Sequence, residues 1–239
     1  MLKKLSVIIP MYNELNNAPK SAVILNEYLT DKLGGDFEII FCDDGSHDGC
    51  AKAVEDLNLP NVRVIGYEKN RGKGAAVRYG IKNSNADIVV YTDCDLAYGC
   101  ENIYSIYKTV ENSSANIVIG SRNLSKDGYE GYTLLRKLMS KLYLKLVSFV
   151  SGFKYTDSQC GIKAMTQESA KTIFGYCTID GFAFDLEVLI LADKLKMVVK
   201  EMPVRIINHR QSESKVHPIS DALKMLSDLR KIKKTHKNT

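Results

Sequence analysis

The first apolar run of the chain is LSVIIPMYNE, residues 5–14, a β-branched segment that closes at Pro10 and continues into polar side chains. Branched apolar residues without helical spacing predict a buried strand over residues 5–10. Residues 18–33 then carry apolar side chains at three- and four-residue steps and end at Gly34, which predicts an amphipathic helix. A buried strand followed directly by a helix is the beginning of an α/β unit.

The same alternation continues along the chain. Further strands are predicted at residues 37–42, 62–67, 87–92 and 115–119, and helices at residues 50–57 and 74–83. In the second half we expect helices at residues 168–174 and 184–195 and an edge strand at residues 198–204. Apolar strands that alternate with helices form mostly parallel sheets with both faces covered. The predicted fold class is therefore α/β, with a Rossmann-like, mostly parallel sheet and helices on both faces.

Composition and charge agree with one globular domain. The 239 residues are 45% hydrophobic and 26% charged, so we expect a single domain over residues 1–239, with a basic C-terminal helix or tail from about residue 218 to 239. The chain has no run of 18 uncharged apolar residues, so no membrane span is predicted. The first residues do not resemble a secretory signal. The six cysteines form no C-x-x-C pair and are expected as free thiols. Together these features predict a cytoplasmic protein.

Charged residues follow four of the predicted strands. In chain order they are Glu14, the pair Asp43 and Asp44, the pair Asp93 and Asp95, and Arg122. In open parallel α/β sheets, ligands bind beyond the carboxyl ends of the strands. One such strand end would carry little weight, but four of them predict a binding site at a single edge of the sheet.

The pair Asp93-x-Asp95 is the first candidate for chemistry. Two carboxylates at a strand end can converge on one hard cation, and Mg²⁺ or Mn²⁺ prefers oxygen ligands together with substrate phosphates. Such a cation would offset the charge that builds up on a departing nucleotide diphosphate. An isolated D-x-D is a weak signal, however, because acidic pairs also cap helices and fill turns.

Two other turns have both a structural and a functional interpretation. In Asp43-Asp44-Gly45-Ser46, such residues are natural in turns and helix caps, but adjacent carboxylates also suit a base or a ribose. The turn at residues 70–74, NRGKG, lacks the spacing of a P-loop, because Lys73 is followed by Gly74. A phosphate-tolerant, glycine-rich turn that opens a helix fits this segment better.

Taken together, the motifs resemble those of family 2 glycosyltransferases of the GT-A fold, over essentially the whole chain. The shared segments are residues 7–14 (VIIPMYNE), 43–46 (DDGS), 70–74 (NRGKG), 93–95 (DCD) and 120–122 (GSR), in the family's order and spacing. Within the family, the chain looks like the dolichyl-phosphate glucosyltransferase and mannose synthase branch, with its bacterial relatives. Residues 157–163 (DSQCGIK), 180–187 (DGFAFDLE) and 213–215 (ESK) carry this finer match, and the amino acids in them favour the glucosyl members.

The resemblance implies a role for particular residues. Donor binding is implied for Pro10, Tyr12, Asn13, Glu14, Asp43, Asp44, Lys73, Asp93, Arg122 and Lys215. Contact with the acceptor phosphate is implied for Arg136, Lys163 and Arg210. The catalytic candidates are Asp93, Asp95, Arg122, Asp185 and Glu187, and the metal, Mg²⁺ or Mn²⁺, would be held by Asp95 with Asp93.

Two positions depart from the pattern of the mannose synthases. Ala97 stands where those enzymes place a polar residue two after the second aspartate, so one metal ligand is missing or is replaced by water. His209 stands where a basic residue is expected six positions before Lys215, and Arg210 lies one step away.

The implied reaction is inverting transfer of a hexose, glucose being favoured, from a nucleotide diphosphate sugar to a polyprenyl or dolichyl phosphate. UDP-glucose is the favoured donor and GDP-mannose the alternative. The second pKa of a phosphomonoester is about 6, so a phosphate acceptor is already anionic and needs no strong general base. A sugar hydroxyl would need a carboxylate base, and Asp185 or Glu187 would serve. The equal alternative is that these two are a helix-start carboxylate and its solvent-facing neighbour.

Three other functions are weighed beside this one. A related enzyme acting on a cell-envelope glycan or a soluble acceptor keeps the same donor site. A non-catalytic nucleotide-sugar binding module keeps the motifs without the reaction. A sugar nucleotidyltransferase would place its glycine-rich loop directly after the first strand, where this chain has Tyr12-Asn13-Glu14. Nucleic acid is disfavoured as a partner, because Asp93 and Asp95 would repel a polyphosphate in the absence of a metal.

Residues 134–150 suggest how a chain without a membrane span reaches a lipid acceptor. Leucines recur there at three- and four-residue steps, and the remaining surface carries Arg136, Lys137, Lys141 and Lys145. This pattern is typical of a helix that lies in an anionic membrane interface. The alternative is a helix that packs on the sheet with its lysines in water. Peripheral membrane contact on the cytoplasmic face is the resulting expectation.

Overall fold

A computed structural model describes residues 3–126, 154–207 and 218–237 of the chain. Its strands are β1 (Lys3–Met11), β2 (Phe37–Asp43), β3 (Val62–Gly66), β4 (Ala86–Tyr91), β5 (Ile117–Ser121), β6 (Lys163–Thr166) and β7 (Val199–Pro203). Its helices are α1 (Ala18–Leu33), α2 (Cys50–Glu55), α3 (Lys73–Asn83), α4 (Gly99–Glu111), α6 (Gln167–Tyr176), α7 (Phe184–Lys194) and α8 (Pro218–Thr235).

The seven strands form one sheet in the order β3-β2-β1-β4-β6-β5-β7. β6 runs antiparallel to both of its neighbours, and the other pairs are parallel. β1 lies in the interior of the sheet, with Leu5 beside Phe37 of β2 and Ile88 of β4. A strand that is covered on both faces needs a continuous apolar run, which explains why residues 5–9 are all buried and why this segment does not alternate.

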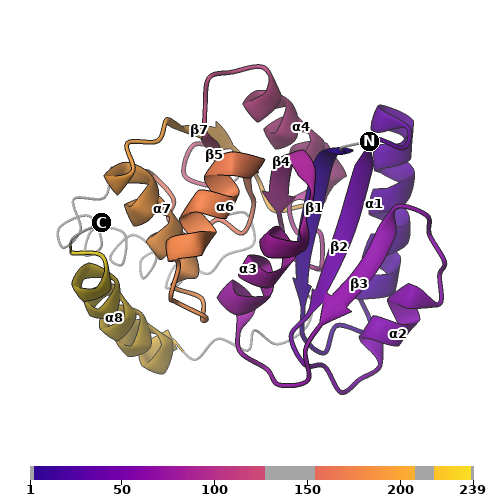
Figure 1. Cartoon of the computed structure of the whole chain (residues 1–239), viewed down its shortest axis with the longest axis horizontal. Helices are drawn as coiled ribbons and strands as arrows, with labels where there is room; N and C mark the ends of the chain where they lie inside the picture. Colours follow the sequence, from indigo (N-terminus) through magenta and orange to yellow (C-terminus); the bar gives the residue numbers. More distant parts are fainter. Residues whose placement is uncertain (1–2, 127–153, 208–217, 238–239) are drawn as a thin grey trace.

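Helices cover both faces of the sheet (Figure 1). The apolar side chains of α1, α2 and α4 form one core with the inward residues of β1, β2 and β4. Those of α3, α6, α7 and α8 form a second core against the opposite face. The mostly parallel α/β sheet with two covered faces is thus confirmed. None of the helices in the described ranges is both long and apolar enough to cross a bilayer.

The predicted elements are confirmed to within about two residues, and the predicted edge strand is β7. Two elements within the described ranges were not predicted. α4 carries Ile103, Ile106, Tyr107 and Val110 at helical steps, a signal that is present in the sequence. β6 is only four residues long and begins with a lysine, so its sequence carries no clear strand signal. Its pairing with β4 and β5 is decided by the sheet around it.

Candidate active site

The loops after β1 and β2 are joined by their own side chains. Asn13 donates its backbone N–H to the Ser46 hydroxyl over 2.9 Å, and its side-chain oxygen accepts the His47 N–H over 2.9 Å. Asn13 has a φ of 53°, a left-handed conformation that asparagine tolerates better than most residues. Asp48 accepts hydrogen bonds from the N–H groups of Leu15 and of Cys50, the first residue of α2, and so joins the loop after β1 to the start of that helix. The structure therefore places Asn13 as a residue that ties the two loops together.

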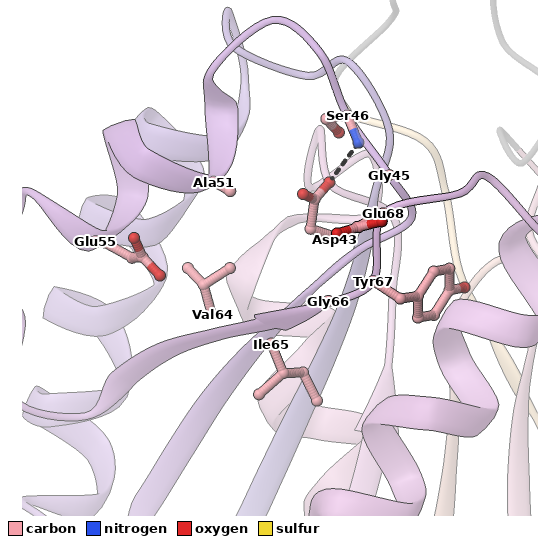
Figure 2. Close-up of a pocket in the computed structure, with 10 residues that line it drawn as sticks. All are labelled: Asp43, Gly45, Ser46, Ala51, Glu55, Val64, Ile65, Gly66, Tyr67 and Glu68. Carbon is pink, nitrogen blue, oxygen red and sulfur yellow. Dashed lines mark hydrogen bonds between the residues drawn. The ribbon is translucent and has the colours of Figure 1, made fainter.

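A pocket of about 320 Å³ opens beside Asp43, between α2 and β3 (Figure 2). The Asp43 carboxylate is half-buried and accepts the Ser46 N–H over 3.1 Å. Gly66 forms part of the wall, and a Cβ added there would lie 2.8 Å from the Asp43 Cβ. The strand can therefore approach Asp43 only because position 66 has no side chain.

Asp44 organises the turn that leads into α3. Its carboxylate is buried, with 3% exposed, and it accepts four hydrogen bonds from the next loop. The donors are the Tyr67 hydroxyl (2.6 Å), the Asn70 amide (2.9 Å), the Arg71 N–H (2.9 Å) and the Gly72 N–H (2.8 Å). Asp44 thus fixes the backbone just before Lys73, which is a structural role in addition to the predicted donor contact.

Asp93 and Asp95 lie directly after β4, as predicted, and Lys73 joins them from the start of α3. The Lys73 ammonium is 2.5 Å from Asp93 Oδ1, and Asp95 Oδ1 accepts the Ala97 N–H over 3.1 Å. Burial alone would lower the pKa of Lys73, but Asp93, Asp185 and Asp95 outweigh it and raise that pKa. The lysine therefore stays charged beside the two aspartates. Leu96 has a φ of 48°, which marks the turn after Asp95 as a strained one.

The glycine-rich turn does not leave the N-terminus of α3 open to a phosphate. The N–H groups of Gly74 and Ala75 both donate to the carbonyl oxygen of Asp180, over 2.7 and 3.3 Å. A Cβ at Gly74 would lie 2.6 Å from the Ile179 carbonyl oxygen, so the glycine is needed for this close packing. The expectation of a phosphate cradle at this turn is corrected, because these backbone donors are already used within the protein.

Arg122 is held by Asp157, a residue of the DSQCGIK segment. Two guanidinium nitrogens of Arg122 contact the two oxygens of Asp157 at 2.7 and 2.9 Å. The backbone N–H of Arg122 donates to the same carboxylate. Burial alone would raise the pKa of Asp157, but the Arg122 guanidinium lowers that pKa by more. The pKa of Asp157 is therefore below its ordinary value. The pair is therefore ionised, and the guanidinium is oriented at the carboxyl end of β5.

The DSQCGIK segment also contacts the aspartate pair. Gly161 packs against Asp93 so closely that a Cβ at position 161 would lie 2.2 Å from Asp93 Oδ2. The Gly161 N–H donates to the hydroxyl of Tyr98, which lies just before α4, over 3.0 Å. Sequence reasoning quoted the segment but missed these roles of Asp157, Gly161 and Tyr98. The available signal was the resemblance of the DSQCGIK segment to the same branch of the family.

Lys163 was predicted to meet the acceptor phosphate, and the structure corrects this. The residue lies in β6, its side chain has no exposed surface, and its ammonium contacts Asp185 and the carbonyl oxygen of Cys160. Asp185 is 4% exposed and also accepts the Tyr91 hydroxyl over 2.7 Å. A buried carboxylate paired with an ammonium is a poor general base, so the alternative catalytic role of Asp185 is not supported either.

Glu187, the other candidate base, is also structural. It is fully buried and its carboxylate accepts the N–H groups of Thr178 and Ile179 and the Thr178 hydroxyl. The imidazole of His236, just after α8, lies 2.8 Å from the same carboxylate. Asp185 lies in the first turn of α7, as the structural alternative expected, but neither Asp185 nor Glu187 faces solvent, so the solvent-facing part of that alternative is wrong. Glu187 instead joins the segment before α7 to the C-terminal helix.

The remaining predicted residues have two outcomes. Tyr12 and Glu14 lie in the loop after β1, where Tyr12 is 38% exposed and Glu14 accepts a hydrogen bond from the Asn17 side chain. Pro10 lies within β1. Arg136, Arg210 and Lys215 lie outside the described residues, as do the basic positions Lys137, Lys141 and Lys145 of the expected interfacial helix.

The acidic pair is suited to a divalent cation bound together with a substrate. In the ranges that the structure describes, no group of three or more His, Cys, Asp or Glu side chains is placed to hold a metal. Asp93 and Asp95 are oxygen donors of the type that Mg²⁺ and Mn²⁺ prefer, and these ions commonly complete their coordination with water and phosphate. The donor set fits a metal that arrives with a nucleotide diphosphate.

Comparison with known proteins identifies the family. Residues 6–174 match the model of the family described as glycosyl transferase family 2. Dolichyl-phosphate beta-glucosyltransferase of Dictyostelium discoideum is 33% identical over 96% of this chain and 73% of its own length. The human dolichyl-phosphate beta-glucosyltransferase is 32% identical over 95% of this chain and 74% of its own length.

Solved structures agree with the fold. Glucosyl-3-phosphoglycerate synthase of Mycobacterium tuberculosis, in complex with phosphoglyceric acid, superposes with a TM-score of 0.70 at 19% identity, over 96% of this chain and 80% of that one. The same enzyme in complex with Mn²⁺, UDP and glucosyl-3-phosphoglycerate gives a TM-score of 0.70 at 17% identity, with the same coverage. This likeness shows the GT-A fold. Together with the family match, it means that the chain belongs to glycosyl transferase family 2 and is a glycosyltransferase.

Proposed function

We propose that this enzyme transfers glucose from UDP-glucose to a dolichyl or polyprenyl phosphate, with inversion at the anomeric carbon. The observation that carries the proposal is the match, along nearly the whole chain, to relatives named dolichyl-phosphate beta-glucosyltransferase. The site adds an independent argument. Both carboxylates that would serve as a base for a hydroxyl acceptor are buried and engaged, and a phosphate acceptor needs no such base.

In the proposed mechanism the chain binds and orients two anionic substrates. Asp43 and Asp44, with the loop that holds Tyr12 and Glu14, lie around the nucleoside, and Asp95 with Asp93 would hold Mg²⁺ or Mn²⁺. When bound, the metal would stabilise negative charge on the departing diphosphate. Arg122, oriented by Asp157, would contact phosphate oxygens. The acceptor phosphate attacks the anomeric carbon from the side opposite the departing nucleotide diphosphate. Orientation and charge stabilisation provide the rate enhancement.

Incubation with labelled nucleotide sugars tests the reaction directly. With a short polyprenyl phosphate and Mg²⁺ or Mn²⁺, we expect label from UDP-glucose to enter the lipid fraction faster than label from GDP-mannose. The matched control is the corresponding polyprenol, which lacks the phosphate and should remain unlabelled. Transfer to the free alcohol, or to a soluble glycan in preference to the lipid phosphate, would contradict the proposed acceptor.

Changing both Asp43 and Asp44 to alanine should weaken binding of UDP. The loss of one hydrogen bond to a charged group costs about 1.5–3 kcal/mol, so the dissociation constant should rise roughly ten- to a hundredfold. Calorimetry with UDP measures this, and Asp56→Ala, an exposed carboxylate at the end of α2, is the matched control. The single variants should separate the two roles: Asp44→Ala should also lower the melting temperature, since four hydrogen-bond donors lose their acceptor. Unchanged UDP affinity in the double variant would contradict the assignment.

We also propose that the enzyme contacts an anionic membrane surface, and α8 supports this within the described residues. Leu229, Ile232 and His236 are buried against the rest of the protein. The exposed residues on the opposite side are Arg230, Lys231, Lys233, Lys234 and Lys237. Figure 1 shows α8 on the side of the molecule away from α2 and β3. Basic residues near an anionic bilayer each contribute about 1 kcal/mol of binding free energy.

Vesicle flotation measures this contact. Vesicles with anionic phospholipids should carry the protein, and neutral vesicles should not. The variant Lys231→Glu/Lys233→Glu/Lys234→Glu should bind anionic vesicles at least about tenfold more weakly. A control with the same change of charge at three other exposed lysines, Lys20, Lys82 and Lys171, should keep most of the binding. Equal losses in the two triple variants would show that net charge, and not α8, is responsible.

A further inference from the structure

The Asp93 carboxylate is paired with Lys73 on one side and packs against Gly161 on the other. Oδ1 lies 2.5 Å from the Lys73 ammonium, and Oδ2 lies against the backbone of Gly161, where a Cβ would come within 2.2 Å. Lys73 is only 18% exposed and Asp93 is 32% exposed, so the pair is partly shielded from water. Asp95, two residues further, accepts a hydrogen bond from Ala97, and its charge helps to raise the pKa of Lys73.

This arrangement opposes a divalent cation at Asp93. Mg²⁺ binds oxygen ligands at about 2.0–2.1 Å, which would bring it within a few ångström of the Lys73 ammonium. Two positive charges at such a separation repel strongly in a partly buried site. The neighbouring Gly161 backbone occupies the space beside Oδ2. A cation can therefore use Asp93 fully only when the Lys73 side chain has moved.

We propose that Lys73 and the divalent cation compete for Asp93, and that the donor diphosphate releases Asp93 by attracting the lysine. The inference rests on the proposed function only in taking a nucleotide diphosphate as the donor. A diphosphate offers the displaced ammonium a new anionic partner, so metal and donor strengthen each other's binding. Such coupling is reciprocal by thermodynamic linkage.

Binding of Mn²⁺ without nucleotide tests the competition, with free Mn²⁺ followed by electron paramagnetic resonance. Removal of the ammonium in Lys73→Met should tighten Mn²⁺ binding by about tenfold, since it removes an adjacent positive charge. Lys82→Met, at an exposed lysine near the other end of the same helix, should leave the affinity unchanged. Lys73→Gln should behave like Lys73→Met, and thermal unfolding checks that each variant is folded.

A double-mutant cycle identifies Asp93 as the contested ligand. In the presence of Lys73, Asp93→Asn should change nucleotide-free Mn²⁺ affinity by less than about threefold, whereas in the Lys73→Met background it should abolish most of the gain. Addition of UDP should tighten Mn²⁺ binding by a larger factor in the wild type than in Lys73→Met, because only the wild type has a lysine to release.

Unchanged or weaker nucleotide-free Mn²⁺ binding in folded Lys73→Met would overturn the proposal and make Lys73 a support for the metal site. The same holds if Asp93→Asn has equal effects in both backgrounds. These outcomes are distinct from a failure of the proposed function. Absence of glucose transfer to polyprenyl phosphate, with the Mn²⁺ results as expected, would leave the competition intact and change only the reaction.

Discussion

Asp95→Ala should lower the rate of sugar transfer by about a thousandfold or more while the protein stays folded. Asp95 lies at the carboxyl end of β4, and Lys73 keeps its ion pair with Asp93 when Asp95 is removed, so the loss of stability should be small. If the metal contributes about 4 kcal/mol of charge stabilisation in the transition state, its loss corresponds to roughly a thousandfold in rate. Turnover with UDP-glucose and a short polyprenyl phosphate, at saturating Mn²⁺, measures the effect.

Asp87→Ala is the matched control, since Asp87 is an exposed carboxylate on the same strand and should keep wild-type turnover. Chelation of the metal in the wild type should give a loss similar to that of Asp95→Ala, and chelation of the variant should then add little. A folded Asp95→Ala protein with near-normal turnover would remove the metal from the mechanism.

Asp157→Ala should destabilise the protein by about 3–5 kcal/mol, because it leaves the Arg122 guanidinium partly buried without its counter-charge. For a chain of this size each kcal/mol lowers the melting temperature by about 2–4 °C, so a fall of roughly 10 °C is expected. The residual activity of the folded variant should also decrease, because Arg122 loses the contact that orients it. Asp56→Ala breaks an exposed ion pair with Lys52, which solvent screens, and should leave the melting temperature nearly unchanged.

The difference in unfolding free energy between wild type and Asp157→Ala should depend on pH with a definite sign. The pKa of Asp157 is lowered in the folded protein by Arg122, relative to about 3.9 for an unfolded aspartate. A lowered folded pKa contributes stability that is present above the unfolded value and is lost as the pH falls through the folded value. The gap in unfolding free energy between wild type and Asp157→Ala should therefore be constant near neutral pH and shrink in acid. A gap that does not shrink would show that the loss of packing, and not the ion pair, is responsible.

Local sequence patterns predicted most of the fold because each central strand and helix carries its own signal. The continuous apolar run of β1 and the helical spacing of α1 follow from burial on both faces and on one face, respectively. The turns after β1, β2 and β4 were placed at one edge because parallel strands point their carboxyl ends the same way. β6 could not be predicted in this manner, since four residues that begin with Lys163 form a strand only between β4 and β5.

What the sequence by itself determined is which chemical groups reach the edge of the sheet, because Asp43, Asp44, Asp93, Asp95 and Arg122 follow strands that each carry a local apolar signal. What only the tertiary structure decided is which of the charged side chains are engaged inside the protein. Lys163 and Asp185 neutralise each other in the core, and Glu187 binds backbone N–H groups and His236. The physical reason is that a buried charge requires a partner, and these partners come from segments far apart in the chain, which no local pattern can specify.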